Sequence, residues 1–438
     1  MNIYVSSLGC VRNQVDSEVM AGRLSRCGHI LCESPESADV IVINTCAFIE
    51  SAAEQAVDEI LTLCEFKKQG SCTKVVVTGC LPQRYGRQAA ESMPEVDVFL
   101  GTGAYESIEE AVNGKLQPGT CLLPPPSRQP LPSWDTARIH DTWPVAYIKV
   151  MEGCARRCTY CIIPELRGPI RSRQADDVAR EAGLLADKGF AEIILAGQET
   201  TSWGTDLDAG QSLADLLEKT ACAAYGVRLR FLYGHPEMID DRLLKTVAEH
   251  PCICRYFDIP VQHVSSRVLK RMGRRYDRRK LMECIERIRG AMPDAALRTT
   301  VLVGFPGETD ADFDELLEFV EQAGFDHLGA FIYSDADDLA SHRLDGHVDP
   351  QTAQDRHDLL MQRQADISLD KNREKIGSRV EVLVEGRAED GRFYGRTRLQ
   401  APEVDGVTFI ETQTAEIGKC MDIRITDADE YDLTGVPE

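Results

Sequence analysis

The sequence has no long apolar run: no uninterrupted stretch approaches the roughly 18 residues needed to cross a bilayer. Residues 1–5 also lack the charged start and apolar core of a signal peptide. Positive charge is scarce, since 49 Lys and Arg stand against 71 Asp and Glu, for a net charge of −22. Such an acidic protein is poorly suited to coat nucleic acid or an anionic membrane. We therefore expect a cytoplasmic protein that contacts no membrane and whose partner is basic.

Cysteine, in contrast, is abundant. The chain of 438 residues, long enough for about three domains, contains 16 cysteines. A disulfide scaffold is normally short and secreted, and this chain is neither. Reduced thiols in this number indicate metal or cluster ligands, although any single cysteine can simply pack as a small hydrophobic residue. Spacing and context must decide between the two.

Residues 1–117 are predicted to form an open parallel α/β domain. Short β-branched runs, typical of buried parallel strands, alternate there with stretches of helical periodicity. Strands are expected at residues 3–8, 40–44 and 74–78, and helices at residues 15–27, 47–68 and 83–93. This β-α-β-α-β-α order favours a parallel sheet covered by helices.

A proline-rich stretch then predicts a domain boundary. Residues 118–144 hold seven prolines, which neither continue a helix nor donate to a sheet. We expect a semi-rigid linker over residues 118–139 and a second α/β domain over residues 140–373. Its six apolar runs lie at residues 145–150, 191–196, 228–233, 255–260, 297–303 and 326–333. Six βα units predict a partial (β/α)6 barrel similar to a TIM barrel, followed by a long polar helix over residues 350–375.

The last part of the chain, residues 375–438, changes character. Short strand candidates occur at residues 379–385, 392–398, 407–410 and 420–426, separated by turn signals. About 60 residues of this kind predict a small antiparallel β-barrel. The whole chain is therefore expected to be an α/β protein of three domains.

Three cysteines lie close together after the first strand of the central domain. Cys154, Cys158 and Cys161 are spaced by three and then two residues, and the next cysteine is Cys222. A 4Fe–4S cubane held by only three thiolates keeps one iron open for a substrate or cofactor. Structural zinc normally requires four ligands, and no matching pair of Cys or His follows. The spacing favours an iron–sulfur cluster, with zinc and simple packing as alternatives.

This triplet resembles the cluster motif of the radical S-adenosylmethionine superfamily, C-x3-C-x2-C with an aromatic residue before the last cysteine. The aromatic residue here is Tyr160, and the resemblance implies that it lies beside the adenine of S-adenosylmethionine. The open iron would chelate the cofactor, and an electron would cleave it to methionine and a 5′-deoxyadenosyl radical. Other polar side chains of the strands and the loops after them are candidates for holding the cofactor, with turn and helix-capping roles as the alternative: Gln198, Glu199, Arg298 and Glu308.

Three N-terminal cysteines are far apart in the sequence but share a position relative to the predicted strands. Cys10, Cys46 and Cys80 each follow one of the three strands. The carboxyl ends of parallel strands lie at one edge of a sheet, so the three thiols can meet there. Gly9 and Gly79 would ease a close backbone approach to a cofactor. A second cluster and ordinary packing are both open on this geometry, and no catalytic residue is assigned beyond the six cysteines.

The sequence around these cysteines resembles the methylthiotransferase family. The resemblance lies in residues 7–18, 44–46 and 78–80, and the family's N-terminal domain, radical S-adenosylmethionine core and TRAM domain cover nearly the whole chain. It implies two 4Fe–4S clusters, the N-terminal one handling sulfur, and two S-adenosylmethionine molecules, which supply a methyl group and a radical. An external electron donor and a sulfur source would be partners. Val11 and Arg12 stand where members often have Pro-Lys, which puts the loop at Cys10 in question.

Other segments resemble the branch of this family that modifies a ribosomal protein. They comprise residues 258–263, 400–406 and 427–433, although Thr434 stands where that branch often has Trp. The implied reaction is methylthiolation of the β-carbon of an aspartate in a basic small-subunit ribosomal protein, free or within the assembled subunit. The alternative is the family's other branch, which acts on a modified adenosine next to the anticodon of transfer RNA.

Charge bears on this choice. Residues 376–438 contain seven basic and fourteen acidic residues, a net charge of −7. Because RNA-binding modules need basic surfaces, an acidic barrel suits a basic protein, or is simply a solvated face. Eight basic residues between 267 and 280 point the other way, because they could contact RNA phosphates or pair with local acids. A non-enzymatic iron–sulfur carrier is a third hypothesis, which predicts bound iron but no cleavage of S-adenosylmethionine.

Overall fold

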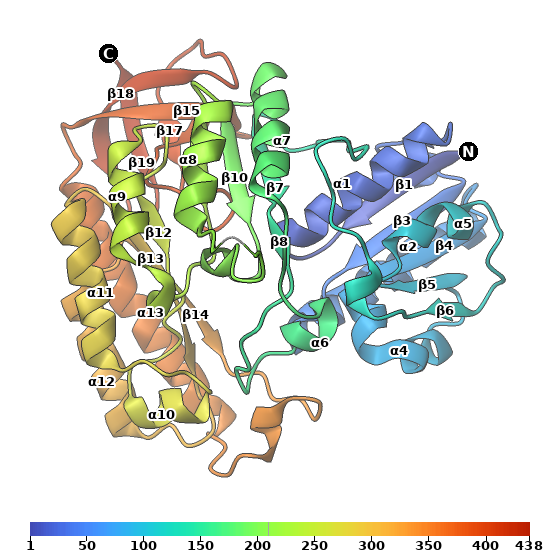
Figure 1. Ribbon diagram of the computed structural model, residues 1–438, viewed down its shortest axis with the longest axis horizontal. Helices are drawn as coiled ribbons and strands as arrows, with labels where there is room; N and C mark the ends of the chain where they lie inside the picture. Colours follow the sequence, from blue (N-terminus) through green and yellow to red (C-terminus); the bar gives the residue numbers. More distant parts are fainter. Residues whose placement is uncertain (209) are drawn as a thin grey trace.

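The computed structural model describes residues 1–208 and 210–438. Figure 1 shows the N-terminal domain beside the central domain, with the C-terminal barrel at one end of the latter. Among the described residues, no helix is both long and apolar enough to cross a membrane.

The N-terminal domain is built on one parallel sheet, as predicted, but the sheet has six strands in the order β2-β1-β3-β4-β5-β6. The strands are β1 (Asn2–Ser7), β2 (Ile30–Leu31), β3 (Val40–Thr45), β4 (Lys74–Gly79), β5 (Val98–Gly101) and β6 (Thr120–Leu122). The three predicted strands are β1, β3 and β4 at its centre. The others are short, and β6 pairs with β5 from within the proline-rich stretch, so their apolar runs gave little signal.

Helices cover both faces of this sheet. They are α1 (Val11–Arg26), α2 (Glu50–Cys64), α3 (Phe66–Gln69), α4 (Cys80–Ser92) and α5 (Ile108–Val112). Side chains along β3 alternate between the two faces. Ile41 and Ile43 pack against α2 and α4, whereas Val40 and Val42 pack against α1 and α5. This alternation is what a strand buried on both faces requires.

The six predicted strands of the central domain are all present. They are β7 (Val145–Lys149), β10 (Glu192–Ala196), β11 (Arg228–Phe231), β12 (Tyr256–Asp258), β13 (Ala296–Val303) and β14 (His327–Ile332). They form two parallel three-stranded sheets, β7-β10-β11 and β12-β13-β14, joined by a bridge between Leu229 and Ile253. The curved sheet stays open, and a small hairpin of β8 (Met151–Glu152) and β9 (Arg171–Ser172) flanks its first strand.

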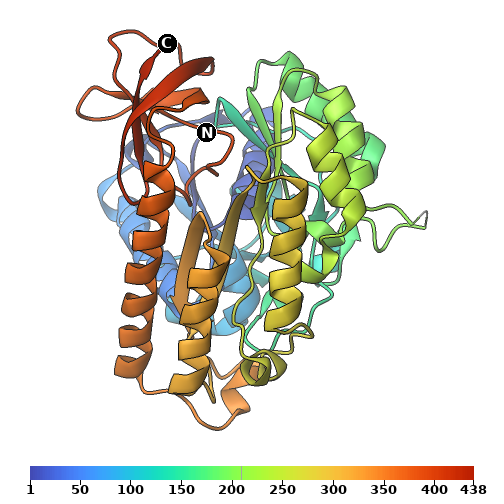
Figure 2. The same cartoon turned by 90° about the vertical axis from the view of Figure 1, so that its left-hand side faces the viewer.

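Helices pack along the outside of this half-barrel. They are α7 (Ala175–Asp187), α8 (Leu213–Ala223), α9 (Asp241–Glu249), α10 (Ser266–Arg271), α11 (Arg278–Ala291), α12 (Asp310–Ala323) and α13 (Pro350–Arg373). The short helix α6 (Ile163–Arg167) lies instead against α4 of the N-terminal domain. Short 3-10 turns complete the chain at η1 (Pro35–Ser37), η2 (Tyr105–Ser107), η3 (Pro126–Arg128), η4 (Thr200–Ser202), η5 (Pro236–Met238) and η6 (Ala340–Arg343). Figure 2 shows α13 running along the side of the central domain up to the barrel.

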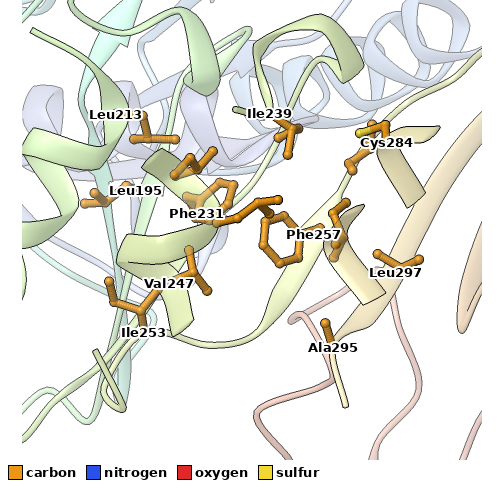
Figure 3. Close-up of a cluster of buried hydrophobic side chains, with 14 of the residues drawn as sticks. Leu195, Leu213, Phe231, Ile239, Val247, Ile253, Phe257, Cys284, Ala295 and Leu297 are labelled. Atoms are coloured by element: carbon orange, nitrogen blue, oxygen red, sulfur yellow. The ribbon is translucent and has the colours of Figure 1, made fainter. Parts of the chain in front are cut away.

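One apolar core continues across the junction between the two three-stranded sheets. Figure 3 shows Leu195 of β10, Phe231 of β11, Phe257 of β12 and Leu297 of β13 in this core. The rings of Phe231 and Phe257 meet edge to face, with centroids 5.8 Å apart. Aromatic packing of this kind ties the two sheets into one unit.

The C-terminal domain is the predicted small barrel, closed in the order β15-β16-β17-β19-β18. Its strands are β15 (Arg379–Arg387), β16 (Phe393–Arg396), β17 (Thr408–Ile410), β18 (Cys420–Ala428) and β19 (Leu433–Pro437). The barrel is mixed and not purely antiparallel, because β17 and β19 pair in parallel. The unpredicted β19 contains Gly435 and Pro437, which weaken a strand signal.

Candidate functional site

The central cysteines lie on the loop between β8 and α6, at the carboxyl end of the first central strand. The Cys154 amide donates to the carbonyl of Gly168 over 3.1 Å, and the Cys161 amide donates to that of Cys158 over 3.1 Å. The Thr159 amide donates to the carbonyl of Met272, also over 3.1 Å. These bonds fold the loop back on itself, with all three thiols partly exposed. Backbone hydrogen bonds thus hold the conformation of the loop that carries the three cysteines.

A cavity of about 440 Å³ opens beside this loop. Its lining includes Cys158, Arg156, Glu199, His235 and Arg274. It lies at the carboxyl ends of the parallel strands, where folds of this kind bind ligands. Cys158 and Glu199 are thus brought to one cavity from separate strand ends.

Tyr160 is fixed by contacts that the sequence did not reveal. Its hydroxyl accepts hydrogen bonds from Arg274, over 3.1 Å from Nε and 2.7 Å from Nη2. Its ring meets Phe305 edge to face, with centroids 6.3 Å apart. Arg274 belongs to the basic run of residues 267–280. Others of that run pair with acids of the chain: Arg267 with Asp312, Arg271 with Asp345, Arg278 with Glu318 and Arg279 with Glu283.

Gln198 and Glu199 follow β10 and are both engaged by neighbouring side chains. Glu199 accepts bonds from Arg156, over 2.8 Å from Nε and 3.1 Å from Nη2. Gln198 donates to Glu152, while its own Oε1 has no hydrogen-bond partner among residues 1–208 and 210–438. A buried carbonyl oxygen without a partner can still accept a bond from a ligand.

Arg298 and Glu308, also predicted as cofactor contacts, are committed to other partners. Arg298 pairs with Asp258 over 3.0 Å and with Asp405 of the barrel over 3.5 Å. Glu308 pairs with Arg356 of α13 over 2.9 Å. Burial raises the pKa of Glu308 to about 7. The structure therefore does not bring these two side chains to the cavity beside Cys158, and their role as cofactor contacts stays a prediction.

The N-terminal cysteines lie at one edge of the sheet, at the ends of its adjacent strands β1, β3 and β4. Cys10 immediately precedes α1, Cys46 follows β3 directly, and Cys80 is the first residue of α4. The chain passes Cys46 very closely at Gly9, which has φ +95°. A Cβ placed on Gly9 would lie 2.4 Å from that of Cys46. Only glycine fits this close approach.

The residues after Cys10 resolve the question left by the departure at Val11 and Arg12. Val11 is the first residue of α1, a position that proline also favours, so either residue permits the same helix start. Arg12 donates from Nη1 to the carbonyl of Gly197 over 3.1 Å, and its guanidinium lies 4.4 Å from the centre of the Tyr233 ring. The first cysteine loop is therefore held against the central domain.

A buried network of charges connects Cys80 with the central domain. Arg167 bonds through Nη1 to Asp16 over 2.8 Å, and its Nη2 approaches the Sγ of Cys80 at 3.5 Å. Lys149 pairs with Asp16 and, over 2.7 Å, with Glu152. Both cationic side chains are 3% exposed or less. Sequence reasoning missed this network. The lysine inside the apolar run of β7 was a signal for it, because a buried lysine is almost always paired with an acid.

Both cysteine trios suit an iron–sulfur cluster. Burial raises the pKa of Cys46 to about 11, and Cys80 and Cys10 add to the rise. Burial likewise raises the pKa of Cys161 to about 12, with neighbouring thiols adding to it. Thiols grouped in this way lose their protons when a metal binds.

A single metal ion and a cubane cluster require different distances between their cysteine ligands. In the described part of the chain, no three His, Cys, Asp or Glu side chains converge closely enough to hold a single metal ion. A cubane binds each thiolate through a different iron, so its cysteines surround it and need not meet at one point. Cysteines that stand apart in this way are compatible with a cubane.

Models of three protein families match the chain. The Radical SAM superfamily matches residues 148–320, the uncharacterized protein family UPF0004 matches residues 2–101, and the TRAM domain matches residues 376–437. The chain is 51% identical over 437 residues to the ribosomal protein uS12 methylthiotransferase RimO of Desulfosudis oleivorans, covering 99% of each. It is 41% identical over 440 residues to the protein of that name from Clostridioides difficile, covering 99% of this chain and 98% of the other.

Solved structures with a similar fold are distant in sequence. The radical S-adenosylmethionine methyltransferase TsrM from Kitasatospora setae, determined with cobalamin and a [4Fe-4S] cluster, has a TM-score of 0.55 and 14% identity, covering 76% of this chain and 74% of that chain. The cobalamin-dependent S-adenosylmethionine radical enzyme OxsB has a TM-score of 0.53 and 14% identity, covering 84% and 56%. At this identity the likeness concerns the fold alone.

Proposed function

Because the chain belongs to the RimO family of ribosomal protein uS12 methylthiotransferases, we propose that it attaches a methylthio group to the β-carbon of an aspartate in uS12. Its family matches place the chain among radical S-adenosylmethionine enzymes with iron–sulfur clusters. The observation that carries the proposal is the presence of two cysteine trios at the strand ends of two parallel sheets. The helix α6, which follows the central trio in the sequence, lies between the two domains (Figure 1). A ribosomal substrate places the reaction in the cytoplasm.

We assign one 4Fe–4S cluster to each trio. Cys154, Cys158 and Cys161 would hold the first, and Cys10, Cys46 and Cys80 would hold the second. When bound, the clusters and S-adenosylmethionine supply the electron, the radical, the methyl group and the sulfur of the reaction. An external donor must deliver the electrons, and a sulfur source must replace the sulfur that leaves with the product.

The protein's own side chains position and shield this chemistry. The cavity beside Cys158 offers the volume and the polar lining for a cofactor that carries an amino and a carboxylate group. Tyr160 belongs to the cluster loop, and its ring, held by Arg274 and Phe305, provides a flat aromatic surface there. Gln198 and Glu199 supply oxygens at the end of β10. The geometry of these groups supports binding and orientation, and no acid–base pair is required.

Charge supports a basic protein as the substrate in preference to transfer RNA. The barrel carries a net charge of −7 over residues 376–438. Four of the eight basic residues between 267 and 280 pair with acids of the chain, and Arg274 is engaged by the hydroxyl of Tyr160. Phosphate recognition needs uncompensated cations, and these pairs halve the number that the run can offer.

The proposal is tested by comparing two substrates in separate reactions. The full chain is reconstituted anaerobically with iron and sulfide, and incubated with S-adenosylmethionine, a reductant, and either a uS12 peptide or a transfer RNA anticodon stem-loop. Mass spectrometry should show a methylthio group in place of one hydrogen on the peptide aspartate. A control peptide with that aspartate replaced by alanine should stay unmodified. Modification of the RNA alone would contradict the proposal.

Two enzyme variants separate the roles of the trios. Cys46→Ser should still cleave S-adenosylmethionine to 5′-deoxyadenosine but leave the peptide unmodified. Cys158→Ser should neither cleave S-adenosylmethionine nor modify the peptide, because the electron reaches S-adenosylmethionine through the central cluster. If Cys158→Ser retained cleavage, the central trio would not hold the radical-generating cluster.

A further inference from the structure

Arg167 belongs to the same short segment as the central cysteines, but its side chain reaches the N-terminal domain. It is the last residue of α6, which begins two residues after Cys161. The carbonyl of the next residue, Gly168, accepts the Cys154 amide over 3.1 Å. The segment that holds one cysteine trio therefore also fixes the backbone of Arg167.

The guanidinium of Arg167 contacts the other cysteine trio at Cys80. Its Nη2 donates toward the Cys80 Sγ over 3.5 Å and also to the side-chain oxygen of Asn13. Its Nη1 donates to Asp16 over 2.8 Å. The side chain is 3% exposed, so these contacts lie away from water. Because both Nη1 and Nη2 are hydrogen-bonded, the planar guanidinium has little freedom to move away from the Cys80 sulfur.

The field of Arg167 reaches the whole N-terminal trio. Burial acts to raise the pKa of Cys10, Cys46 and Cys80, and the guanidinium of Arg167 acts in the opposite direction on each of them. Low water access makes such a charge more effective than it is at the surface. Any extra negative charge placed among these three sulfurs is therefore stabilised by this cation.

We propose that Arg167 is a positioning residue that raises the reduction potential of the N-terminal cluster by donating to the Cys80 sulfur. Reduction adds negative charge to the cluster, and hydrogen bonds to its sulfurs and nearby cations favour the reduced form. The inference rests on the cluster assigned to Cys10, Cys46 and Cys80 under the proposed function. It makes the potential of one cluster depend on the segment that binds the other.

The test isolates the N-terminal cluster in the full chain. Cys154, Cys158 and Cys161 are replaced together by alanine, so that only the other trio binds iron. Arg167→Gln is then introduced, and the potential is measured by an electron paramagnetic resonance titration. At the midpoint of the parent protein, the ratio of reduced to oxidised cluster should fall at least tenfold, a shift of about 59 mV for a one-electron couple.

Arg167→Lys serves as the conservative variant. It keeps the positive charge but loses the rigid fork that bonds Cys80 and Asp16 together. The potential should fall in the same direction but by less than in Arg167→Gln. This variant also decides the matter if Arg167→Gln loses its iron.

Arg84 provides a matched control. It too is a buried arginine between domains, with a side chain 4% exposed, and it pairs with Asp338 over 2.6 Å. It lies near the N-terminal trio, because its Nη1 donates to the carbonyl of Ala47 over 2.9 Å, but its bonds go to oxygen and not to sulfur. Arg84→Gln should leave the potential of the cluster unchanged.

The outcomes separate cleanly when iron content and circular dichroism are recorded for each protein. A parent-like potential in both Arg167 variants at full iron content would overturn the inference, as would an equal shift in Arg84→Gln. If neither Arg167 variant holds a cluster while Arg84→Gln does, Arg167 serves to retain the cluster and the inference on potential fails. Absence of a cluster from the parent protein would instead refute the assignment of the N-terminal trio itself.

Discussion

The two cysteine trios are assembled in opposite ways. The central trio lies within residues 154–161, on one loop whose own hydrogen bonds shape it. The N-terminal trio spans residues 10–80 and exists only because β1, β3 and β4 lie side by side in one sheet. A local site needs a loop, whereas a site gathered by topology needs a whole domain and the contacts that hold it in place.

Their surroundings differ accordingly. Beside the central trio lies a cavity, and the Arg156 side chain that pairs with Glu199 is 30% exposed. Beside Cys80 lies the buried network of Asp16, Arg167 and Lys149. The central trio is thus open to a small molecule, and the N-terminal trio is packed against charges from the neighbouring domain. The predictions below test this contrast first and then the contacts of the barrel.

The largest effect is expected from removing either trio. Replacing all three cysteines of one trio by alanine should lower bound iron by about half, because each trio holds one cubane of the same composition. Iron and sulfide analysis after anaerobic reconstitution measures this. Equal iron content before and after removal of a trio would show that it holds no cluster.

A second large effect should appear only at the N-terminal trio. Asp16→Ala leaves Lys149 and Arg167 buried with less compensation, which typically costs about 3–5 kcal/mol. Glu199→Ala at the central trio leaves Arg156, whose side chain is 30% exposed and so stays in contact with water, and should cost about 1 kcal/mol or less. The urea midpoint of unfolding, followed by circular dichroism, compares the two variants. Similar midpoints for the two variants would show that the surroundings of the two trios do not differ in this way.

The same contrast explains what the sequence could predict. Spacing alone marked the central trio, and β-α alternation was enough to put Cys10, Cys46 and Cys80 at one sheet edge. Such signals are local or follow from strand order.

Contacts between distant residues could not be predicted. The Arg167–Asp16 bond joins residues 151 positions apart. Arg298 and Glu308 were expected near the cofactor because they belong to a strand and to the loop after it. Arg298 also pairs with Asp405 of the barrel, and Glu308 pairs with Arg356 of α13. No periodicity encodes which side chain of a later element will meet an earlier one.

A third prediction concerns a buried network of charges that lies apart from both cysteine trios. Glu192 of β10 pairs with Arg230 over 2.6 Å and with Arg396 of the barrel over 3.1 Å. Burial acts to raise the pKa of Glu192, but these two arginines outweigh it and lower the pKa from 4.5 to about 2. Such a shift contributes stability of about 3 kcal/mol that is present above pH 4.5 and lost as the pH falls toward 2.

The measurement is the urea midpoint between pH 7 and pH 3, in wild type and in Glu192→Gln. Wild type should lose stability below pH 4.5 more steeply than the variant, which starts lower at pH 7 because its arginines are less well paired. Parallel pH profiles would show that Glu192 does not anchor the barrel to the central domain.

Gly9→Ala should disturb the N-terminal trio by a smaller amount. The added Cβ would meet that of Cys46 at 2.4 Å, and φ is +95°, a strained value for alanine. Backbone strain of this kind costs about 1–3 kcal/mol. We expect partial loss of iron from the N-terminal trio. Gly28→Ala, which has φ +83° but open space around it, controls for backbone strain alone.

The smallest effect concerns the approach of the substrate and not the trios themselves. Asp427, Asp429 and Glu430 are exposed on the barrel. Neutralising them together, as Asp427→Asn, Asp429→Asn and Glu430→Gln, should raise the KM for uS12 a few-fold and leave kcat unchanged. Exposed charges contribute only about 0.2–1 kcal/mol each, chiefly to encounter with a basic partner.

The control for this variant neutralises acids on another surface. Asp355, Asp358 and Asp366 are exposed on α13. Changing them to asparagine removes the same net charge from the chain, so a general electrostatic attraction predicts equal effects from both triple variants. A larger rise in KM for the barrel variant would locate substrate docking on the barrel. Added salt should make this rise smaller, because it screens the charges. Equal effects would mean that the net charge of the enzyme, and not docking on the barrel, attracts the basic substrate.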